Sequence, residues 1–303
     1  TLAKAKQDRM NLLKACRANF SPIFGLFSDP SGEVDAILYE TMKDESFAVI
    51  EENGIINKAW RLNDTKKLAR ITEYFNDKKI LIADGHHRYE TALKYCKENR
   101  SKVDDSAHVM MFLTNLDAQS LAVYPIHRLI KSPAPFDEAD FMNQVENYFS
   151  VGPISEGIEK NKIRKALDSA DAGDIVFYVY FGQGRGCFIK IKEKTNMLPL
   201  LATDESEELM VLDVAQLHTI ILKNILNIDT KEPNSQKYVT YKVDMIEALG
   251  RVDSGEFDLA FFMNATRVND VRNLAEKGIR LPQKATFFYP KLLSGLVINK
   301  FES

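Results

Sequence analysis

Hydrophobic and polar positions repeat with a helical period in three segments of the first 130 residues. Apolar residues three or four positions apart predict amphipathic helices over 1–19, 65–77 and 88–99. The positions expected to face inward in the last two helices are Leu68, Ile71 and Phe75, and Tyr89, Ala92, Leu93 and Cys96. Short apolar runs between the helices predict strands over 79–84, 108–116 and 120–130.

Two pairs of apolar runs are separated by turn sequences, which is typical of hairpins. Residues 21–43 carry the turn sequence SDPSGE between two apolar runs, so we predict a hairpin there. Residues 46–64 repeat this plan, with Asn53-Gly54 as the turn signal.

The composition changes over residues 131–141, which hold two prolines, and we interpret this segment as a linker or a domain boundary. Beyond it we expect helices over 136–149, 158–170, 206–226 and 268–278, a hairpin over 174–192, a strand over 257–266 and a closing apolar segment over 285–299. Helices and strands alternate irregularly, which predicts an α+β (mixed α/β) fold. The predicted domains are residues 1–130 and residues 131–303.

Composition and charge narrow the class of protein. The 303 residues are 45% hydrophobic and 27% charged, with a net charge of −3, and this balance argues against binding to duplex nucleic acid. The three cysteines are far apart, which fits a reducing, cytoplasmic compartment without disulfides. No apolar run is long enough for a membrane span. The sequence starts at Thr1 without a methionine, so we expect a piece of a longer protein whose N-terminal segment is missing.

The most informative junction is the sequence ADGHHRYETA, residues 83–92, where a predicted strand meets a predicted helix. The start of a helix attracts anions, and a glycine there lets a ligand approach the backbone closely. Arg88 would add a bidentate partner for phosphate, and His86 and His87 could transfer protons near neutral pH. Asp84 could cap the helix, orient a histidine or bind Mg²⁺, and Glu90 could act as a general acid or base or as a metal ligand. Alternatively, Asp84 is a plain cap and both histidines face solvent.

Four other segments hold candidate residues. His127 and Arg128 lie in or just after a strand, where they would point to opposite faces; they are either site residues or edge residues with surface salt bridges. Asp213 and His218 are too far around a helix to act as joint ligands, so Asp213 is expected to be a cap or a partner of a basic residue and His218 to be structural. The sequence GQGRG at 182–186 is expected to be a hairpin turn.

The fourth segment lies near the C-terminus and combines basic and aromatic residues. Its members are Arg280, Lys284, Thr286, Tyr289 and Lys291. Lys284 and Lys291 could cover a phosphate or a nucleobase, or they could be rim charges on an edge strand.

Four sequence stretches carry a resemblance to a known family. ADGHHRYETA, YPIHRLI, LDVAQLHTIIL and PQKATFFYPKLLSGLVIN together resemble the bacterial and archaeal domain-of-unknown-function family 1015. This resemblance runs across nearly the whole chain. It also implies a further N-terminal segment, which agrees with the absent methionine.

More remotely, the strand–DGHHRYETA–helix unit is similar to the core of the ParB/sulfiredoxin superfamily, which includes free serine kinases. ParB proteins carry G-E-R-R and sulfiredoxins G-C-H-R at a helix start that touches nucleotide phosphates. Gly85 matches the glycine and Arg88 the final arginine of both elements. His87 matches the Arg or His, and His86 stands where sulfiredoxins have their reactive cysteine, which argues against sulfinic acid repair.

The resemblance implies a nucleotide- or phosphate-binding phosphotransferase or phosphohydrolase acting on a small metabolite, with serine or phosphoserine as the first substrate to test. His86, His87 and Glu90 would be catalytic, and Asp84 and Glu90 would hold Mg²⁺ beside a purine nucleotide. The residues expected to bind phosphate or nucleotide are Asp84, Gly85, Arg88, His127, Arg128, Lys284 and Lys291. The alternative is a non-catalytic, nucleotide-binding regulator of the ParB type.

Overall fold

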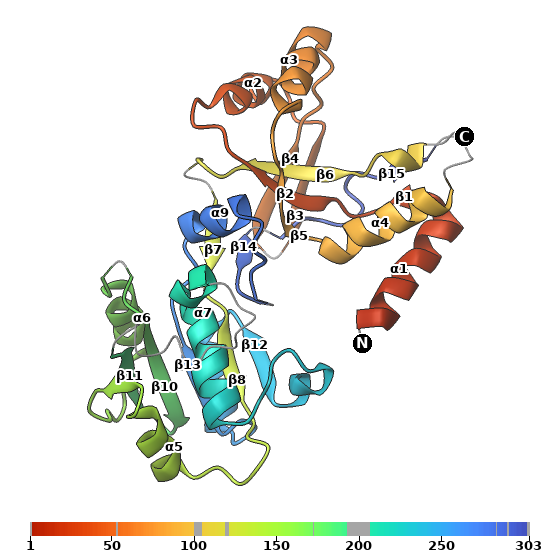
Figure 1. The fold of residues 1–303 in the computed structure, drawn as a ribbon. Helices are drawn as coiled ribbons and strands as arrows, with labels where there is room; N and C mark the ends of the chain where they lie inside the picture. Colours follow the sequence, from red (N-terminus) through yellow and green to blue (C-terminus); the bar gives the residue numbers. More distant parts are fainter. Residues whose placement is uncertain are drawn as a thin grey trace. The chain divides into compact units, whose positions relative to one another are not determined.

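The structure, a computed structural model, divides the chain into two compact units (Figure 1). It describes residues 2–52, 54–99, 105–118, 121–171, 173–192, 207–282, 284–289 and 291–301. Unit 1 comprises Thr1–Ala122 with Pro290–Ser303, and unit 2 comprises Val123–Tyr289. The division predicted from the sequence lies after residue 130, with residues 290–303 in the second domain. None of the helices in the described ranges is both long and apolar enough to cross a membrane.

Unit 1 mixes helices with three small sheets. Its helices are α1 (Leu2–Cys16), α2 (Glu33–Thr41), α3 (Thr65–Phe75) and α4 (His86–Glu98). Its strands are β1 (Ala18–Asn19), β2 (Ile23–Phe27), β3 (Ala48–Glu52), β4 (Ile55–Ala59), β5 (Leu81–Asp84), β6 (Met111–Asn115) and β15 (Asn299–Lys300). The largest sheet has the order β5-β2-β6, in which β2 is antiparallel to β5 and parallel to β6. β3 pairs with β4 and β1 with β15.

The predicted hairpin over 21–43 is wrong, because its second half is the helix α2. Val34, Ile37 and Thr41 recur with a helical period and are buried on one face of that helix. The turn residues before it build a helix start: the Asp29 carboxylate accepts the N–H of Val34 at 2.9 Å. Asp29 is 1% exposed, yet hydrogen bonds from Ser31 and the backbone hold its pKa below the usual range against the opposing effect of burial.

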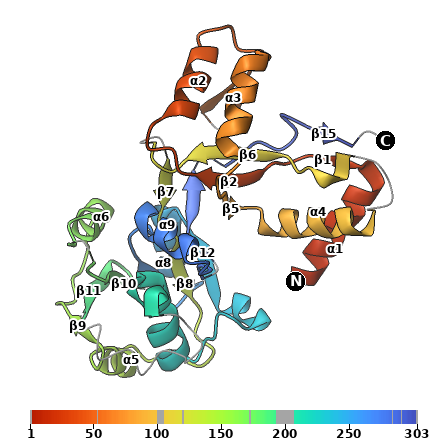
Figure 2. The same ribbon diagram turned by 45° about the horizontal axis from the view of Figure 1, so that its top comes forward.

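The predicted hairpin over 46–64 and the predicted helices at 65–77 and 88–99 are confirmed as β3–β4, α3 and α4; of the turn, Asn53 lies outside the described residues. The inward face of α4 differs from the prediction. Thr91 and Tyr95 are buried, whereas Tyr89 and Leu93 are 40% and 41% exposed. The reason is that α4 packs against α1 as well as against the sheet, and both views show these two helices side by side (Figures 1 and 2).

Unit 2 is built on one six-stranded antiparallel sheet of order β12-β8-β13-β10-β11-β9. The strands of this sheet are β8 (His127–Ile130), β9 (Phe149–Val151), β10 (Val176–Gly182), β11 (Arg185–Ile191), β12 (Val239–Lys242) and β13 (Leu259–Phe262). β14 (Phe287–Tyr289) pairs instead with β7 (Ala122–Tyr124), which begins at the last residue of unit 1. Its helices are α5 (Glu138–Val145), α6 (Lys160–Asp168), α7 (Asp213–Gln216), α8 (Met245–Asp253) and α9 (Val268–Glu276). The described chain is therefore mixed α+β, as predicted.

Each face of this sheet carries its own hydrophobic core. Ile130 and Phe261 belong to the core that α5 and the helical segment 213–225 cover. Leu129 and Phe262 belong to the other core, which α6 and α8 cover. Since neighbouring strand residues face opposite ways, His127 shares the second face and Arg128 the first.

Two predicted elements of unit 2 are interrupted. The predicted helix over 206–226 consists of a 3₁₀ turn at Glu207–Val211, then α7, then a π-helix at Leu217–Ile225; Ser206 lies outside the described residues. The predicted strand over 120–130 is split into β7 and β8 at Pro125, which has no N–H for a ladder. The hairpin around GQGRG is confirmed as β10–β11, with positive φ at Gln183 and Gly184.

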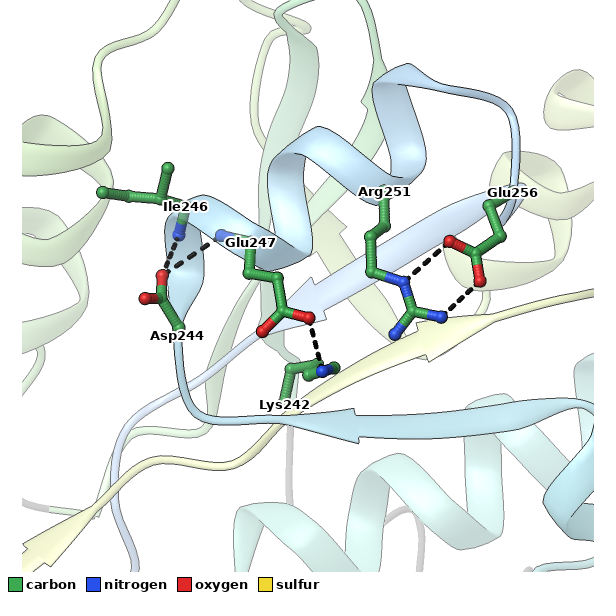
Figure 3. Close-up of polar contacts among 6 residues, drawn as sticks. All are labelled: Lys242, Asp244, Ile246, Glu247, Arg251 and Glu256. Atoms are coloured by element: carbon green, nitrogen blue, oxygen red, sulfur yellow. Dashed lines mark hydrogen bonds and ion pairs between the residues drawn. The ribbon is translucent and has the colours of Figure 1, made fainter.

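Helix α8 was not predicted, although its start and flanks are well defined (Figure 3). Asp244 caps it by accepting the N–H groups of Ile246 at 2.7 Å and Glu247 at 3.1 Å. Ion pairs join Lys242 to Glu247 and Arg251 to Glu256. The short strands β9 and β12 were missed as well.

Candidate functional site: the start of helix α4

Gly85 joins β5 to α4 in a left-handed conformation, with φ 94° and ψ 22°. Such a φ disfavours any residue with a Cβ. An added Cβ would also lie 2.9 Å from Nε and Nη2 of Arg88, because that guanidinium folds back over the turn. No side chain caps the helix, so its first N–H groups are left to solvent or to a ligand.

Arg88 is held beside this turn by two protein groups. Its Nη1 donates to the carbonyl of Pro22 at 2.6 Å, and its Nη2 donates to Oδ2 of Asp84 at 3.3 Å. Burial lowers the pKa of the guanidinium, the Asp84 charge opposes that shift, and the nearby Arg9 charge adds to it. The positive charge of Arg9, on α1, therefore acts on Arg88. This effect was not predicted from the sequence, because it depends on the packing of α1 against α4.

The two histidines differ in exposure. His86 is the first residue of α4 and is exposed, whereas His87 is half-buried. The carbonyl of His87 accepts a hydrogen bond from the Thr91 hydroxyl at 2.7 Å. His86 is therefore the histidine that a ligand at the turn can reach most directly.

The two predicted metal ligands are engaged by basic side chains. Asp84 pairs with Arg88, and Glu90 pairs with Lys6 of α1 at 2.6 Å. Among the residues that the structure describes, no group of three or more His, Cys, Asp or Glu side chains could hold a metal. The residues present thus do not fit a Mg²⁺ site made by the protein alone, and no chemical step is assigned to a metal here.

His127 lies in the interior of unit 2. It is 1% exposed and its ring lies 4.8 Å from that of Phe262, with no hydrogen-bond partner for Nδ1 in the described chain. Burial, helped by the charges of Arg128 and Arg164, lowers its pKa to about 3. The imidazole is therefore a neutral core group at neutral pH.

Arg128 is also 1% exposed, and its donors are taken by protein atoms. Its Nε donates to Nε2 of His218 at 3.3 Å, its Nη2 to the carbonyl of Lys284 at 2.9 Å, and its Nη1 to Sδ of Met263 at 2.9 Å and to the carbonyl of Ile126. Burial lowers its pKa to about 10, so it stays charged at neutral pH. These hydrogen bonds connect three segments of unit 2. The guanidinium is buried, so it is not accessible to a phosphate ligand in this structure.

His218 is buried beside Arg128, whereas Asp213 is half-buried. The Nδ1 of His218 lies 3.1 Å from the Thr230 hydroxyl, and burial lowers its pKa to about 3. Burial raises the pKa of Asp213 to about 6, while the Arg128 and Arg267 charges oppose that shift. The expectation that His218 is structural agrees with this arrangement, and the expectation that Asp213 is a cap or a partner of a basic residue stays a prediction.

The two predicted lysines lie in different units. Lys284, in unit 2, is exposed with φ 58°. Lys291, in unit 1, is exposed as well. Their predicted role in binding phosphate or nucleotide stays a prediction.

A pocket of about 190 Å³ lies elsewhere in unit 2. It is lined by Glu208, Asp270, Asn273, Leu274 and Lys277. None of the predicted site residues lines it, and an ion pair of 3.0 Å joins Glu208 to Lys277 beside it. We therefore keep the start of α4 as the candidate site.

The sequence identifies the family. Residues 1–215, more than half of the chain, match the family described as protein of unknown function (DUF1015), so the chain belongs to it and the predicted membership is confirmed. No curated protein matches the sequence.

Several solved structures are similar over most of their length. A conserved hypothetical protein from Pyrococcus furiosus is 13% identical, with a TM-score of 0.42, and the match covers 97% of this chain and 88% of that one. A free serine kinase in complex with AMP is 14% identical, with a TM-score of 0.43 and coverage of 96% and 83%. A free serine kinase mutant in complex with ADP is 12% identical, with a TM-score of 0.43 and coverage of 96% and 84%.

Proposed function

We propose that the chain binds a phosphorylated small molecule at the start of α4 and transfers or hydrolyses its phosphoryl group there. The observation that carries this proposal is the Gly85 turn, which leaves the start of the helix without a side-chain cap beside the Arg88 guanidinium. Helix N–H groups and guanidinium groups together favour a ligand with two negative charges.

Arg88 is suited to exchange one of its partners for the ligand. Its 2.6 Å bond to the Pro22 carbonyl fixes the guanidinium, whereas its 3.3 Å contact with Asp84 is longer and is made to an exposed carboxylate. A phosphate oxygen can take the place of Asp84 without moving the arginine. Arg88→Ala should weaken binding about tenfold or more, since a charge-assisted hydrogen bond contributes roughly 1.5 to 3 kcal/mol.

His86 supplies the acid–base chemistry in this proposal. An attacking hydroxyl or water oxygen bonds to phosphorus, the bond from phosphorus to the leaving oxygen breaks, and the imidazole takes the proton of the attacking group. Such transfer depends mainly on positioning and electrostatic stabilisation, which this small set of groups can supply. A purine nucleotide with serine, and phosphoserine with water, are the reactions to test first because of the sequence resemblance to free serine kinases.

The test is steady-state phosphoryl transfer and phosphoserine hydrolysis with the parent, His86→Asn and His87→Asn. His86→Asn should keep ligand affinity and lose roughly 10² to 10⁴ of the rate. His108→Asn is the matched control, because His108 is an exposed histidine outside α4. Full activity of both α4 variants would remove the catalytic role of the histidines. Binding without turnover in the parent would favour the non-catalytic regulator.

A further inference from the structure

The β3–β4 hairpin of unit 1 is a two-stranded sheet that pairs with no other strand in the described chain. Val49 lies opposite Lys58, and Glu51 lies opposite Ile56, so these four side chains share one face. We call it the Val49 face. All four are exposed, with Val49 58% and Ile56 62% accessible.

The other face of the hairpin is more covered. There Glu52 is exposed, Ile50 and Ile55 are 39% and 37% exposed, and Ala48, Asn57 and Ala59 are half-buried. A two-stranded hairpin alone is marginally stable in water, and its more open face here carries two large aliphatic side chains. The Val49 face is therefore the one that lacks a partner.

The apolar and the charged residues of the Val49 face are arranged so that the face is complementary to itself. Its two apolar residues lie on one diagonal and its two charged residues, Glu51 and Lys58, on the other. Within the part of the chain that the structure describes, neither charged residue forms an ion pair. Cross-strand neighbours are about 5 Å apart and same-face neighbours along a strand about 7 Å apart, so the four side chains form a nearly square set.

We propose that the Val49 face is an interface with a second copy of this chain, related by a two-fold axis along the Val49–Ile56 diagonal. That axis sets Val49 against Val49 and Ile56 against Ile56 of the other copy. It also exchanges the two charged corners, so each Glu51 meets a Lys58. The strands of the two copies cross at a steep angle, as in orthogonally packed sheets.

Other two-fold arrangements of this face are unfavourable. An axis parallel to the strands sets Val49 against Lys58 and Glu51 against Ile56. An axis across the strands sets Val49 against Glu51 and Lys58 against Ile56. An axis along the charged diagonal brings like charges together, which is repulsive. Only the axis along the Val49–Ile56 diagonal places apolar residues against apolar residues and opposite charges against each other. This self-complementarity favours a second copy of the chain over an unrelated partner.

The size of the face sets the expected affinity. Four side chains per copy bury far less than the roughly 1,200 to 2,000 Å² of stable complexes. The dimer should therefore be weak and should form reversibly as the protein concentration rises.

Sedimentation velocity over a wide range of protein concentration tests the proposal by charge exchange. Glu51→Lys and Lys58→Glu should each raise the dimer dissociation constant about tenfold, because symmetry turns two attractive pairs into two repulsive ones. The double variant Glu51→Lys/Lys58→Glu should restore the parent value. A parent that stays monomeric at every concentration, or a double variant as weak as the single ones, would overturn the proposal.

A second pair of variants separates the interface from general surface effects. Val49→Asp should abolish the dimer, since two carboxylates would meet at the axis. Val297→Asp is the matched control: it changes the same residue type in the same unit, and Val297 is 54% exposed. Urea unfolding of each variant at low concentration shows whether the monomer is folded. Equal loss of the dimer in both variants would count against the Val49 face.

Discussion

Gly85→Ala should lower the free energy of unfolding by more than the left-handed backbone conformation at this position accounts for. A left-handed conformation costs a residue with a Cβ about 1 to 2 kcal/mol. In addition, the new Cβ would lie 2.9 Å from the Arg88 guanidinium, which must move aside. Moving it breaks the 2.6 Å hydrogen bond to the Pro22 carbonyl, a further roughly 1.5 to 3 kcal/mol. We expect a total of about 2.5 to 5 kcal/mol.

Gly32→Ala is the matched control for this prediction. Gly32 also precedes a helix, with φ 68°, and an added Cβ would meet nothing within 4 Å. The lower entropy of the unfolded alanine chain is common to both variants and cancels in the comparison. Gly32→Ala should therefore cost only about 1 to 2 kcal/mol.

The assay is urea unfolding of both variants in the parent and in an Arg88→Ala background. In that background the free-energy cost of Gly85→Ala should fall to about that of Gly32→Ala, because the guanidinium is gone. Any remaining difference between the two glycines reflects the strain of the larger φ at Gly85. This is a double-mutant cycle for two groups in contact. Equal costs for the two glycines in the parent background would refute the placement of Arg88 over the turn.

Three further predictions concern unit 2, each measured by urea unfolding. Arg128→Met should lower the free energy of unfolding by about 2 to 4 kcal/mol, because the buried carbonyls of Ile126 and Lys284 lose their donor. An unchanged urea midpoint would contradict a structural role of Arg128. The pKa of His127 is about 3, below its usual 6.5, so the unfolded chain takes up a proton first and stability falls as the pH drops from 6.5 towards 3. His127→Leu should reduce that fall while changing stability little at pH 7. The pKa of Asp213 is about 6, above the usual 3.8, so its protonated form stabilises the native state at low pH and this is lost as the pH rises towards 6. Asp213→Asn should match the parent near pH 4 and be more stable at pH 7 by up to about 2 kcal/mol; a less stable variant at pH 7 would refute this.

Local features of the fold could be predicted from the sequence. The Asn53-Gly54 turn signal and the strand–glycine–helix junction at Gly85 depend on residues close in the chain, and β3–β4 and the start of α4 formed as expected. The error at α2 was avoidable. Val34 and Ile37 already show a helical spacing, but the sequence SDPSGE was interpreted as a hairpin turn when it is a helix start.

Features that join distant segments could not be predicted. Arg128 meets His218 and the Lys284 carbonyl, 90 and 156 positions away. In a sequence, an arginine next to a histidine is as compatible with a ligand-binding site as with a buried structural pair. The charge of Arg9 likewise acts on Arg88 only because α1 packs against α4. Only tertiary contacts decide such cases.

The central claim is that a phosphorylated ligand binds at the start of α4, and histidine NMR tests it most directly. The chain has five histidines, which single His→Gln variants can assign. Titration with ADP, phosphoserine and inorganic phosphate should shift the ring signals of His86 and His87 and leave those of the buried His127 and His218 unchanged. Arg88→Ala should move the midpoint of that titration about tenfold higher. Unchanged His86 and His87 signals with all three ligands at millimolar concentration, or shifts confined to His127 and His218, would contradict the account.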